Sequence, residues 1–230
     1  MSAPHHAAIA IDGPAASGKS TIARCLAARL GLVVVNSGAM YRAVTWEILR
    51  RGIDPNNEAE VVAALAAMDI DCGVSAGRST ILVNGVDPGE ALRSEEVNRS
   101  VSAIAAVPAV RERLVAIQRD YRARTSVVME GRDIGSVVFP DTPFKLYIDA
   151  SEEVRQARRQ ADGEHDKVSS RDAADSARET APLMVAPGAA VVDTLLDVAS
   201  HGPGGRWHLL VPTGRPPGAG SRRGPGAQAV

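Results

Sequence analysis

The sequence predicts an α/β protein: a three-layer sandwich with a five-stranded parallel sheet, a phosphate-binding loop and a small inserted region. Three observations support this prediction. Short apolar runs alternate with segments whose apolar residues have helical spacing. A glycine-rich loop stands between the first apolar run and the first helical segment. A stretch after residue 68 departs from the alternation.

Strands and helices alternate from the start of the chain. The run at 7–11 is short and apolar, and it stops at Asp12 and Gly13. Apolar residues then recur with helical spacing over 18–30, which predicts a strand, a loop and a helix. Further strands are expected at 33–35 and in the runs "SVVMEG", "FKLYIDA" and "GAAVVDT", and further helices at 38–51, 58–68, 94–106 and 108–123. This alternation is typical of a parallel sheet with helices on both faces.

The stretch "DIDCGVSAGRSTILVNGVDP" at 69–88 has a different pattern. Short β-prone runs are separated by Gly, Ser and Asn, which are turn residues, so we expect an antiparallel hairpin. This hairpin interrupts the strand–helix alternation, and we interpret it as an insertion.

The segment 201–230 also departs from the rest of the chain. It is rich in Gly and Pro, has no acidic residue, and its longest apolar stretch lies within "WHLLV". Such a composition cannot bury much apolar surface, so we expect disorder in this segment.

Composition restricts the classes of function. The chain has 230 residues, 45% of them hydrophobic and 23% charged, and a formal net charge of -1. A charge so close to zero gives no overall field toward nucleic acid or an anionic membrane. The two cysteines, Cys25 and Cys72, have no metal-binding spacing, and no apolar run approaches the roughly 20 residues of a membrane span. We expect a cytoplasmic protein without nucleic-acid or membrane partners.

The loop "GPAASGKS" at 13–20 matches G-x-x-x-x-G-K-[ST] between a predicted strand and a predicted helix. Glycines let backbone amides surround phosphate oxygens, and the helix N-terminus adds partial positive charge. Lys19 can reach the outer phosphates, and Ser20 can hold Mg²⁺. A nucleoside triphosphate is the expected ligand.

Other motifs narrow the class of phosphate-binding protein. Neither N-K-x-D nor D-x-x-G after a suitable strand occurs, which argues against a GTPase. The later strands end in "MEGRD" and "YIDAS" rather than in paired acids, which argues against a motor or transporter ATPase. A small enzyme fits better.

Several polar residues follow strands at the edge where the phosphate loop is expected. Tyr41 and Arg42 could contact a ribose and a phosphate, or Tyr41 could pack while Arg42 is solvated. Arg132 and Asp133 place a donor next to an acceptor, although a structural ion pair is the alternative. Arginines on a flap would stabilise a transferring phosphoryl group, whereas a solvated helix face is the alternative for each one. These arginines are Arg155, Arg158, Arg159, Arg171 and Arg178.

The motifs together resemble a known family. "AIDGPAASGKST", "NSGAMYRA", "SAIAAVPAVRERL", "MEGRDIGSVVFPD", "KLYIDAS" and "RDAADSAR" stand in this order between residue 7 and residue 194. The chain therefore resembles the nucleoside monophosphate kinases, and more closely the bacterial cytidylate kinases. "GRDIGSVVFPD" after "SGAMYR" is more specific for that family than the phosphate loop is.

The resemblance implies roles for individual residues. The ATP phosphates would be held by Gly13, Pro14, Ala15, Ala16, Ser17, Gly18, Lys19, Ser20 and Thr21, with Ser20 also at Mg²⁺. The acceptor would be bound by Ser37, Tyr41, Arg42, Ser102, Arg111, Asp133 and Asp175. The transfer itself would involve Lys19, Arg132, Arg158, Arg171 and Arg178. Among the acceptor residues, Asp133 suits cytosine because a carboxylate accepts from the amine of cytosine and not from the carbonyl of uracil.

The implied activity is ATP- and Mg²⁺-dependent phosphorylation of CMP and dCMP by a monomer. The kinase domain would span 1–200, with core segments 7–68 and 107–194, a monophosphate-binding insertion at 69–106 and a short lid at 155–175. Two departures from the family are a lid connection about ten residues shorter than usual and a tail in place of a final amphipathic helix. A kinase of another nucleotide or metabolite, or a nucleotide-binding protein with impaired catalysis, are the alternatives.

Overall fold

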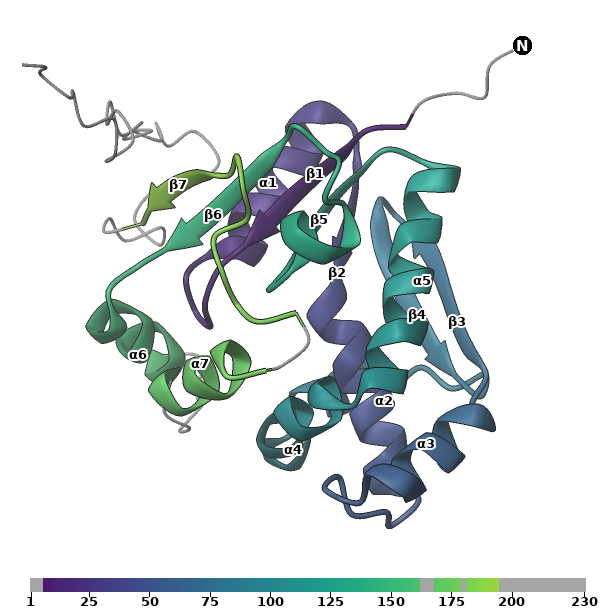
Figure 1. The fold of residues 1–230 in the computed structure, drawn as a ribbon. Coiled ribbons are helices and arrows are strands. Elements are labelled where there is room, and N and C mark those ends of the chain that lie inside the picture. The colour runs from purple at the N-terminus through teal and green to yellow at the C-terminus, as the bar shows by residue number, and fades with distance from the viewer. Residues whose placement is uncertain (1–5, 162–167, 179–180, 195–230) are drawn as a thin grey trace, which may run out of the picture.

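A computed structural model describes residues 6–161, 168–178 and 181–194 of the chain. Within these residues one sheet has the strand order β3-β4-β2-β5-β1-β6-β7 (Figure 1). The strands are β1 (Ala8–Asp12), β2 (Val33–Asn36), β3 (Ile70–Ser75), β4 (Arg78–Val83), β5 (Val127–Gly131), β6 (Lys145–Asp149) and β7 (Ala190–Asp193). The parallel α/β prediction is confirmed for the five adjacent strands β2, β5, β1, β6 and β7.

The prediction of only five strands is wrong, because the hairpin joins the sheet. β3 and β4 pair antiparallel, and Ala76 and Gly77 between them both have positive φ, as a two-residue hairpin turn requires. β4 then pairs with β2 through Val34 and Arg78. The sequence pattern predicts the hairpin, but it does not show that the hairpin would extend the main sheet to seven strands.

The first five helices agree with the sequence pattern to within about two residues at each end, which is usual for helix boundaries, whereas the pattern gave no bounds for the last two. They are α1 (Lys19–Leu30), α2 (Ser37–Arg50), α3 (Glu58–Ala66), α4 (Glu95–Ala106), α5 (Pro108–Arg124), α6 (Glu152–Ala161) and α7 (Val168–Ser176). Side chains of Asn36, Asn57 and Ser94 accept from the first turns of α2, α3 and α4. Short 3₁₀ and π turns occur at Gly89–Arg93 and Ile134–Val138.

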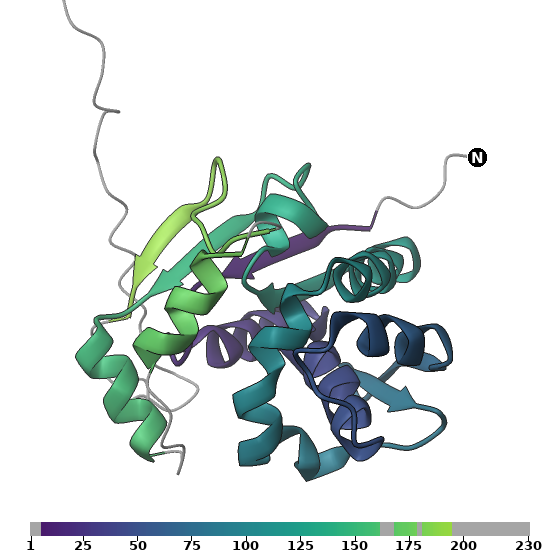
Figure 2. The ribbon, with the colours of Figure 1, turned by 60° about the horizontal axis from the view of Figure 1, so that its bottom comes forward.

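Two apolar clusters place helices on both faces of the sheet. Neighbouring residues of a strand point to opposite faces, and Ala10 and Ile11 of β1 belong to different clusters. The smaller cluster joins Ile11 to Ala23 and Ala27 of α1, and the larger one contains residues of α2, α3, α4 and α5. In both ribbon views α6 and α7 lie together beyond the end of β6 (Figures 1 and 2), and α7 also contacts α4.

The carboxyl ends of the central parallel strands meet at one edge of the sheet. The segments that follow β1, β2 and β5 carry the phosphate loop, the start of α2, and Arg132 with Asp133. A functional site is expected at such an edge. The expected disorder at 201–230 and the expected tail in place of a final amphipathic helix concern residues outside the described ranges. No helix in the described ranges is long and apolar enough to cross a membrane.

Candidate active site

The phosphate loop is shaped by its glycines and by the strand beside it. Gly13 has φ 146°, and a Cβ there would lie 2.0 Å from the carbonyl oxygen of Ile148 on β6, so no larger residue fits. Gly18 is left-handed immediately before α1 begins. The loop therefore delivers Lys19 and Ser20 to the first turn of α1, where free backbone amides favour an anion.

Lys19 is buried at the base of this loop. Its ammonium donates to the carbonyl oxygen of Pro14 at 2.6 Å. Burial and, to a smaller extent, the positive charge of Arg132 lower the pKa of Lys19 to about 7, against the opposing effect of Glu130 and Asp12. A phosphate beside this ammonium would favour its charged form.

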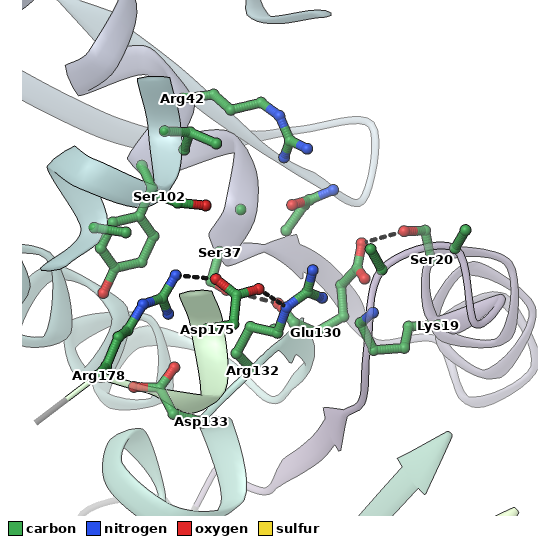
Figure 3. Close-up of a pocket in the computed structure, with 18 of the residues that line it drawn as sticks. Lys19, Ser20, Ser37, Arg42, Ser102, Glu130, Arg132, Asp133, Asp175 and Arg178 are labelled. Atoms are coloured by element: carbon green, nitrogen blue, oxygen red, sulfur yellow. Dashed lines mark hydrogen bonds and ion pairs between the residues drawn. The ribbon is translucent and has the colours of Figure 1, made fainter. Parts of the chain in front are cut away.

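Ser20 and Glu130 bring two oxygen ligands together. The hydroxyl of Ser20 donates to Glu130 Oε1 at 2.6 Å, and the hydroxyl of Ser37 donates to the Glu130 carbonyl at 2.8 Å (Figure 3). Mg²⁺ is commonly bound by one or two protein oxygens together with phosphates and water. This donor set fits Mg²⁺, and no cluster of three or more His, Cys, Asp or Glu that could form an all-protein metal site exists in the described part of the chain.

Arg132 and Arg178 converge on Asp175 of α7. Arg132 Nε donates to Asp175 Oδ2 at 2.7 Å, while Arg132 Nη1 donates to the carbonyl of Gly13 at 2.9 Å. Arg178 pairs with the other oxygen of Asp175 (Figure 3). The expected alternative of an ion pair between the neighbours Arg132 and Asp133 is not what forms, since each residue pairs with a different partner. Two guanidinium groups are thus held side by side next to the phosphate loop.

Asp133 pairs with Arg111 of α5 in the interior of the protein. Arg111 Nη2 donates to Asp133 Oδ2, and Arg111 Nη1 donates to the carbonyl of Ala105 at 3.1 Å. The guanidinium of Arg111 also lies 5.6 Å from the ring centroid of Tyr41, within the range of a cation–π contact. Burial raises the pKa of Asp133, and the charge of Arg111 opposes this shift.

Helices α6 and α7 contact the phosphate loop through charged side chains. Asp172 accepts from the Ala15 amide at 3.2 Å and pairs with Arg155 through its other oxygen. Arg158 donates to Thr194 Oγ1 at 3.1 Å and to the carbonyl of Ala16 at 3.4 Å. The sequence analysis did not predict these contacts of Asp172 and Arg158. Both side chains hold the phosphate loop from the side of α6 and α7.

One cavity collects most of the residues that the sequence singled out. Its lining includes Ala15, Ala16, Lys19, Ser20, Ser37, Tyr41, Arg42, Ser102, Arg111, Arg132, Asp133, Asp175 and Arg178. Arg158 does not line the cavity, because its guanidinium is engaged with Thr194 and the loop. Arg171 lies on α7, but its side chain is outside the described part.

The cavity contains two further charged residues, of which the sequence analysis missed Glu130 and named Arg159 only among the flap arginines. Glu130 lies near the end of β5, the strand that pairs with β1. An acidic residue at a strand end beside a phosphate loop is the signal that could have identified it. Arg159 lines the cavity and shares a helix face with Arg155, four residues earlier, whereas the family resemblance assigned the transfer to its neighbour Arg158.

Known proteins match the chain over most of its length. The family model described as cytidylate kinase matches residues 9–199. A cytidylate kinase of Streptomyces griseus is 43% identical over 195 residues, which cover 81% of this chain and 84% of that protein. One of Solibacter usitatus is 42% identical over 205 residues, covering 83% and 87%. A bifunctional pantoate ligase/cytidylate kinase of Parasynechococcus marenigrum is 43% identical over 77% of this chain and 38% of that protein. The chain belongs to the cytidylate kinase family.

Proposed function

We propose that the protein transfers the γ-phosphoryl group of ATP to CMP or dCMP, with Mg²⁺, giving the nucleoside diphosphate and ADP. The observation that carries this proposal is the position of the buried Arg111–Asp133 pair, which shares one cavity with Lys19 of the phosphate loop. A base-reading pair and a phosphate-holding loop in one cavity suit transfer between two nucleotides. Family membership supports the same reaction.

Asp133 and Arg111 are the groups we assign to the cytosine ring. The Asp133 carboxylate has a second oxygen that can accept from the exocyclic amine, and Arg111 and Ser102 can donate to the ring carbonyl and N3. Uracil offers a carbonyl where cytosine has its amine, so the carboxylate would repel it. Ser37, Arg42 and Arg132 would bind the acceptor's phosphate, and Tyr41 and Asp175 would lie near its sugar.

Transfer needs positioning and charge neutralisation rather than a general base, because the acceptor is already a phosphate oxyanion at neutral pH. An oxygen of the CMP phosphate bonds to the γ-phosphorus while the bond from that phosphorus to the β–γ bridging oxygen breaks, leaving ADP. Lys19, Arg132, Arg158, Arg171 and Arg178 would stabilise the charge on the transferred group. Mg²⁺ held near Ser20 and Glu130 would neutralise charge on the β- and γ-phosphates.

The same proposal gives roles to two regions of the chain. The segment 69–106, which contains the hairpin and α4, would form the monophosphate-binding region, since Ser102 of α4 lines the cavity. The segment 155–175 would act as a short lid over the phosphate loop, in keeping with the contact between Asp172 and Ala15. We propose a monomer that acts in the cytoplasm on free nucleotides.

Following the label from γ-labelled ATP tests the reaction itself. With CMP and Mg²⁺ present, we expect the label to appear in CDP in an amount equal to the ADP formed. Binding of both nucleotides by calorimetry without label in CDP would instead favour a catalytically impaired binding protein. Transfer of the label to water would identify an ATPase and contradict the proposal.

A further inference from the structure

Asp12 and Gly13 join the end of β1 to the segment after β5 by three hydrogen bonds. The Asp12 carboxylate accepts from the backbone amide of Ile134 at 2.7 Å through one oxygen and from that of Gly135 at 2.8 Å through the other. The carbonyl of Gly13 accepts from Arg132 Nη1 at 2.9 Å. We call this set of three bonds, between residues 12–13 and 132–135, the β1–β5 clasp.

The clasp is buried and closely fitted. Asp12 is only 3% exposed. A Cβ at Gly135 would lie 3.2 Å from Asp12 Oδ2 and 3.3 Å from the Cβ of Ala186, so a side chain at residue 135 would require its neighbours to shift by a few tenths of an ångström. A buried carboxylate is costly unless its oxygens are hydrogen-bonded, and here each oxygen has a backbone donor.

The clasp requires the ionised form of Asp12. A carboxylate accepts through both oxygens, whereas a protonated acid or an amide has a donor on one side that would meet a backbone N–H. The pKa of Asp12 is raised to about 6. Burial is the main cause and the charge of Asp133 adds to it, whereas the bonds from Gly135 and Ile134 and the charge of Lys19 oppose the shift. The group is therefore ionised at neutral pH.

The two sides of the clasp serve different substrates in the proposed reaction. Asp12 directly precedes the loop assigned to ATP, and Ile134 directly follows Arg132 and Asp133, which are assigned to the acceptor. The backbone that carries the acceptor-binding side chains is thus held by a side chain of the donor-binding segment. Arg132 completes the link by bonding both Gly13 and Asp175.

We propose that Asp12 is a positioning residue for the acceptor, which fixes the backbone of 132–135 so that Arg132 and Asp133 meet CMP in a single arrangement. This inference rests on the proposed function. Asp12 does not line the cavity, and its role would be exerted through the backbone bonds of Ile134 and Gly135.

Asp12→Asn tests the inference, because the amide keeps the size of the side chain and loses one acceptor. We expect the KM for CMP to rise about tenfold, the effect of one lost buried hydrogen bond, while the KM for ATP changes less than about threefold. Hydrogen exchange of the backbone at 132–139 should become faster in the variant. Gly135→Ala, which crowds the Asp12 carboxylate without changing its charge, should shift the same two quantities in the same direction.

Val61→Ala is the control for loss of stability alone. Val61 is fully buried on α3, does not line the cavity, and its truncation removes core packing. We expect a lower melting temperature with the KM for CMP and exchange at 132–139 unchanged. A similar pattern in Asp12→Asn, or equal rises in the KM of CMP and of ATP, would overturn the inference.

The wild-type chain is assayed first, so that failure of the proposed function can be distinguished from failure of the positioning role of Asp12. If its best acceptor is neither CMP nor dCMP, the proposed function fails and the same variants are compared with that acceptor. If CMP or dCMP is the best acceptor and Asp12→Asn leaves its KM unchanged, the positioning role fails while the proposed function stands. Should Asp12→Asn not fold, Gly135→Ala alone decides the question by the same readouts.

Discussion

Arg111 and Asp133 form an ion pair in which the two side chains are exposed by only 4% and 5%. Such a pair gains little net stability, because taking both charges out of water offsets their attraction. Removing one partner is costly, since the other charge then stays buried and unpaired. The pair is therefore better explained by recognition than by stability.

Asp133→Ala should raise the KM for CMP far more than the KM for ATP. The variant removes the acceptor for the cytosine amine and leaves Arg111 buried without its partner, so we also expect a loss of about 3–5 kcal/mol in the free energy of unfolding. Initial rates against each substrate, with denaturant unfolding, measure both effects.

Asp141→Ala is the matched control for Asp133→Ala. Asp141 pairs with Arg122 at 2.7 Å on the surface, where 64% of its side chain is exposed, and surface pairs contribute about 0–1 kcal/mol. Neither KM should change. Equal rises in both KM values in Asp133→Ala would count against a base-reading role.

Lys19 should make ATP binding depend on pH. Its pKa of about 7 means that the free protein loses this proton as the pH rises through 7, while bound phosphates favour the charged form. Binding at about pH 8 should take up a proton, and the Kd for ATP should rise with pH above 7. Calorimetry in two buffers of different ionisation enthalpy measures the uptake.

The same pKa fixes the sign of the effect of Lys19 on stability. Between pH 7 and 10.5 the unfolded chain binds more protons at Lys19 than the folded chain does. The contribution of Lys19 to the free energy of unfolding therefore rises with pH in this window. Lys19→Met should abolish the proton uptake on ATP binding, whereas Lys145→Met, which removes an ammonium bonded to the carbonyl of Pro140, should not. Uptake that persists in Lys19→Met would assign it to another group.

Glu130→Gln should raise the Mg²⁺ concentration needed for half-maximal rate. The carboxylate accepts from Ser20 and supplies negative charge where we place the metal. An amide keeps the hydrogen bond but loses that charge, so we expect about a tenfold increase. Mg²⁺ titrations at saturating nucleotides measure it, with Glu60→Gln on the exposed start of α3 as control. An unchanged Mg²⁺ requirement would remove Glu130 from the metal site.

Asp172→Asn should weaken ATP binding. The carboxylate bridges the Ala15 amide and Arg155, and the amide variant keeps only part of this bridge. We expect the KM for ATP to rise about tenfold with a smaller change for CMP. Asp120→Asn, which alters a surface pair with Arg124, serves as control. A larger effect on CMP than on ATP would contradict the assignment of this contact to the donor side.

Local patterns in the sequence predict the elements of the fold well, because helical spacing, capping residues and turn residues act over a few positions. Asn36 and Ser94 cap helices close to where the pattern begins them. The pairing of β4 with β2 depends on a long-range contact between Val34 and Arg78, and the count of five strands was wrong for that reason.

The site shows the same division between local and long-range information. Motifs identify Lys19, Arg132 and Asp133, which lie within a few residues of a loop or strand end. Their partners come from distant segments: Arg132 bonds Asp175, and Asp133 bonds Arg111. The Asp12 carboxylate meets amides more than a hundred residues away, and no local pattern predicts that contact.

The preference among acceptors tests the central claim most directly. With Mg-ATP saturating, kcat/KM is measured for CMP, dCMP, UMP and AMP on the same preparation. A buried carboxylate that accepts from the cytosine amine predicts the highest values for CMP and dCMP, and a loss of this preference over UMP in Asp133→Ala. A higher kcat/KM for UMP or AMP than for CMP and dCMP in the wild-type chain would contradict the account.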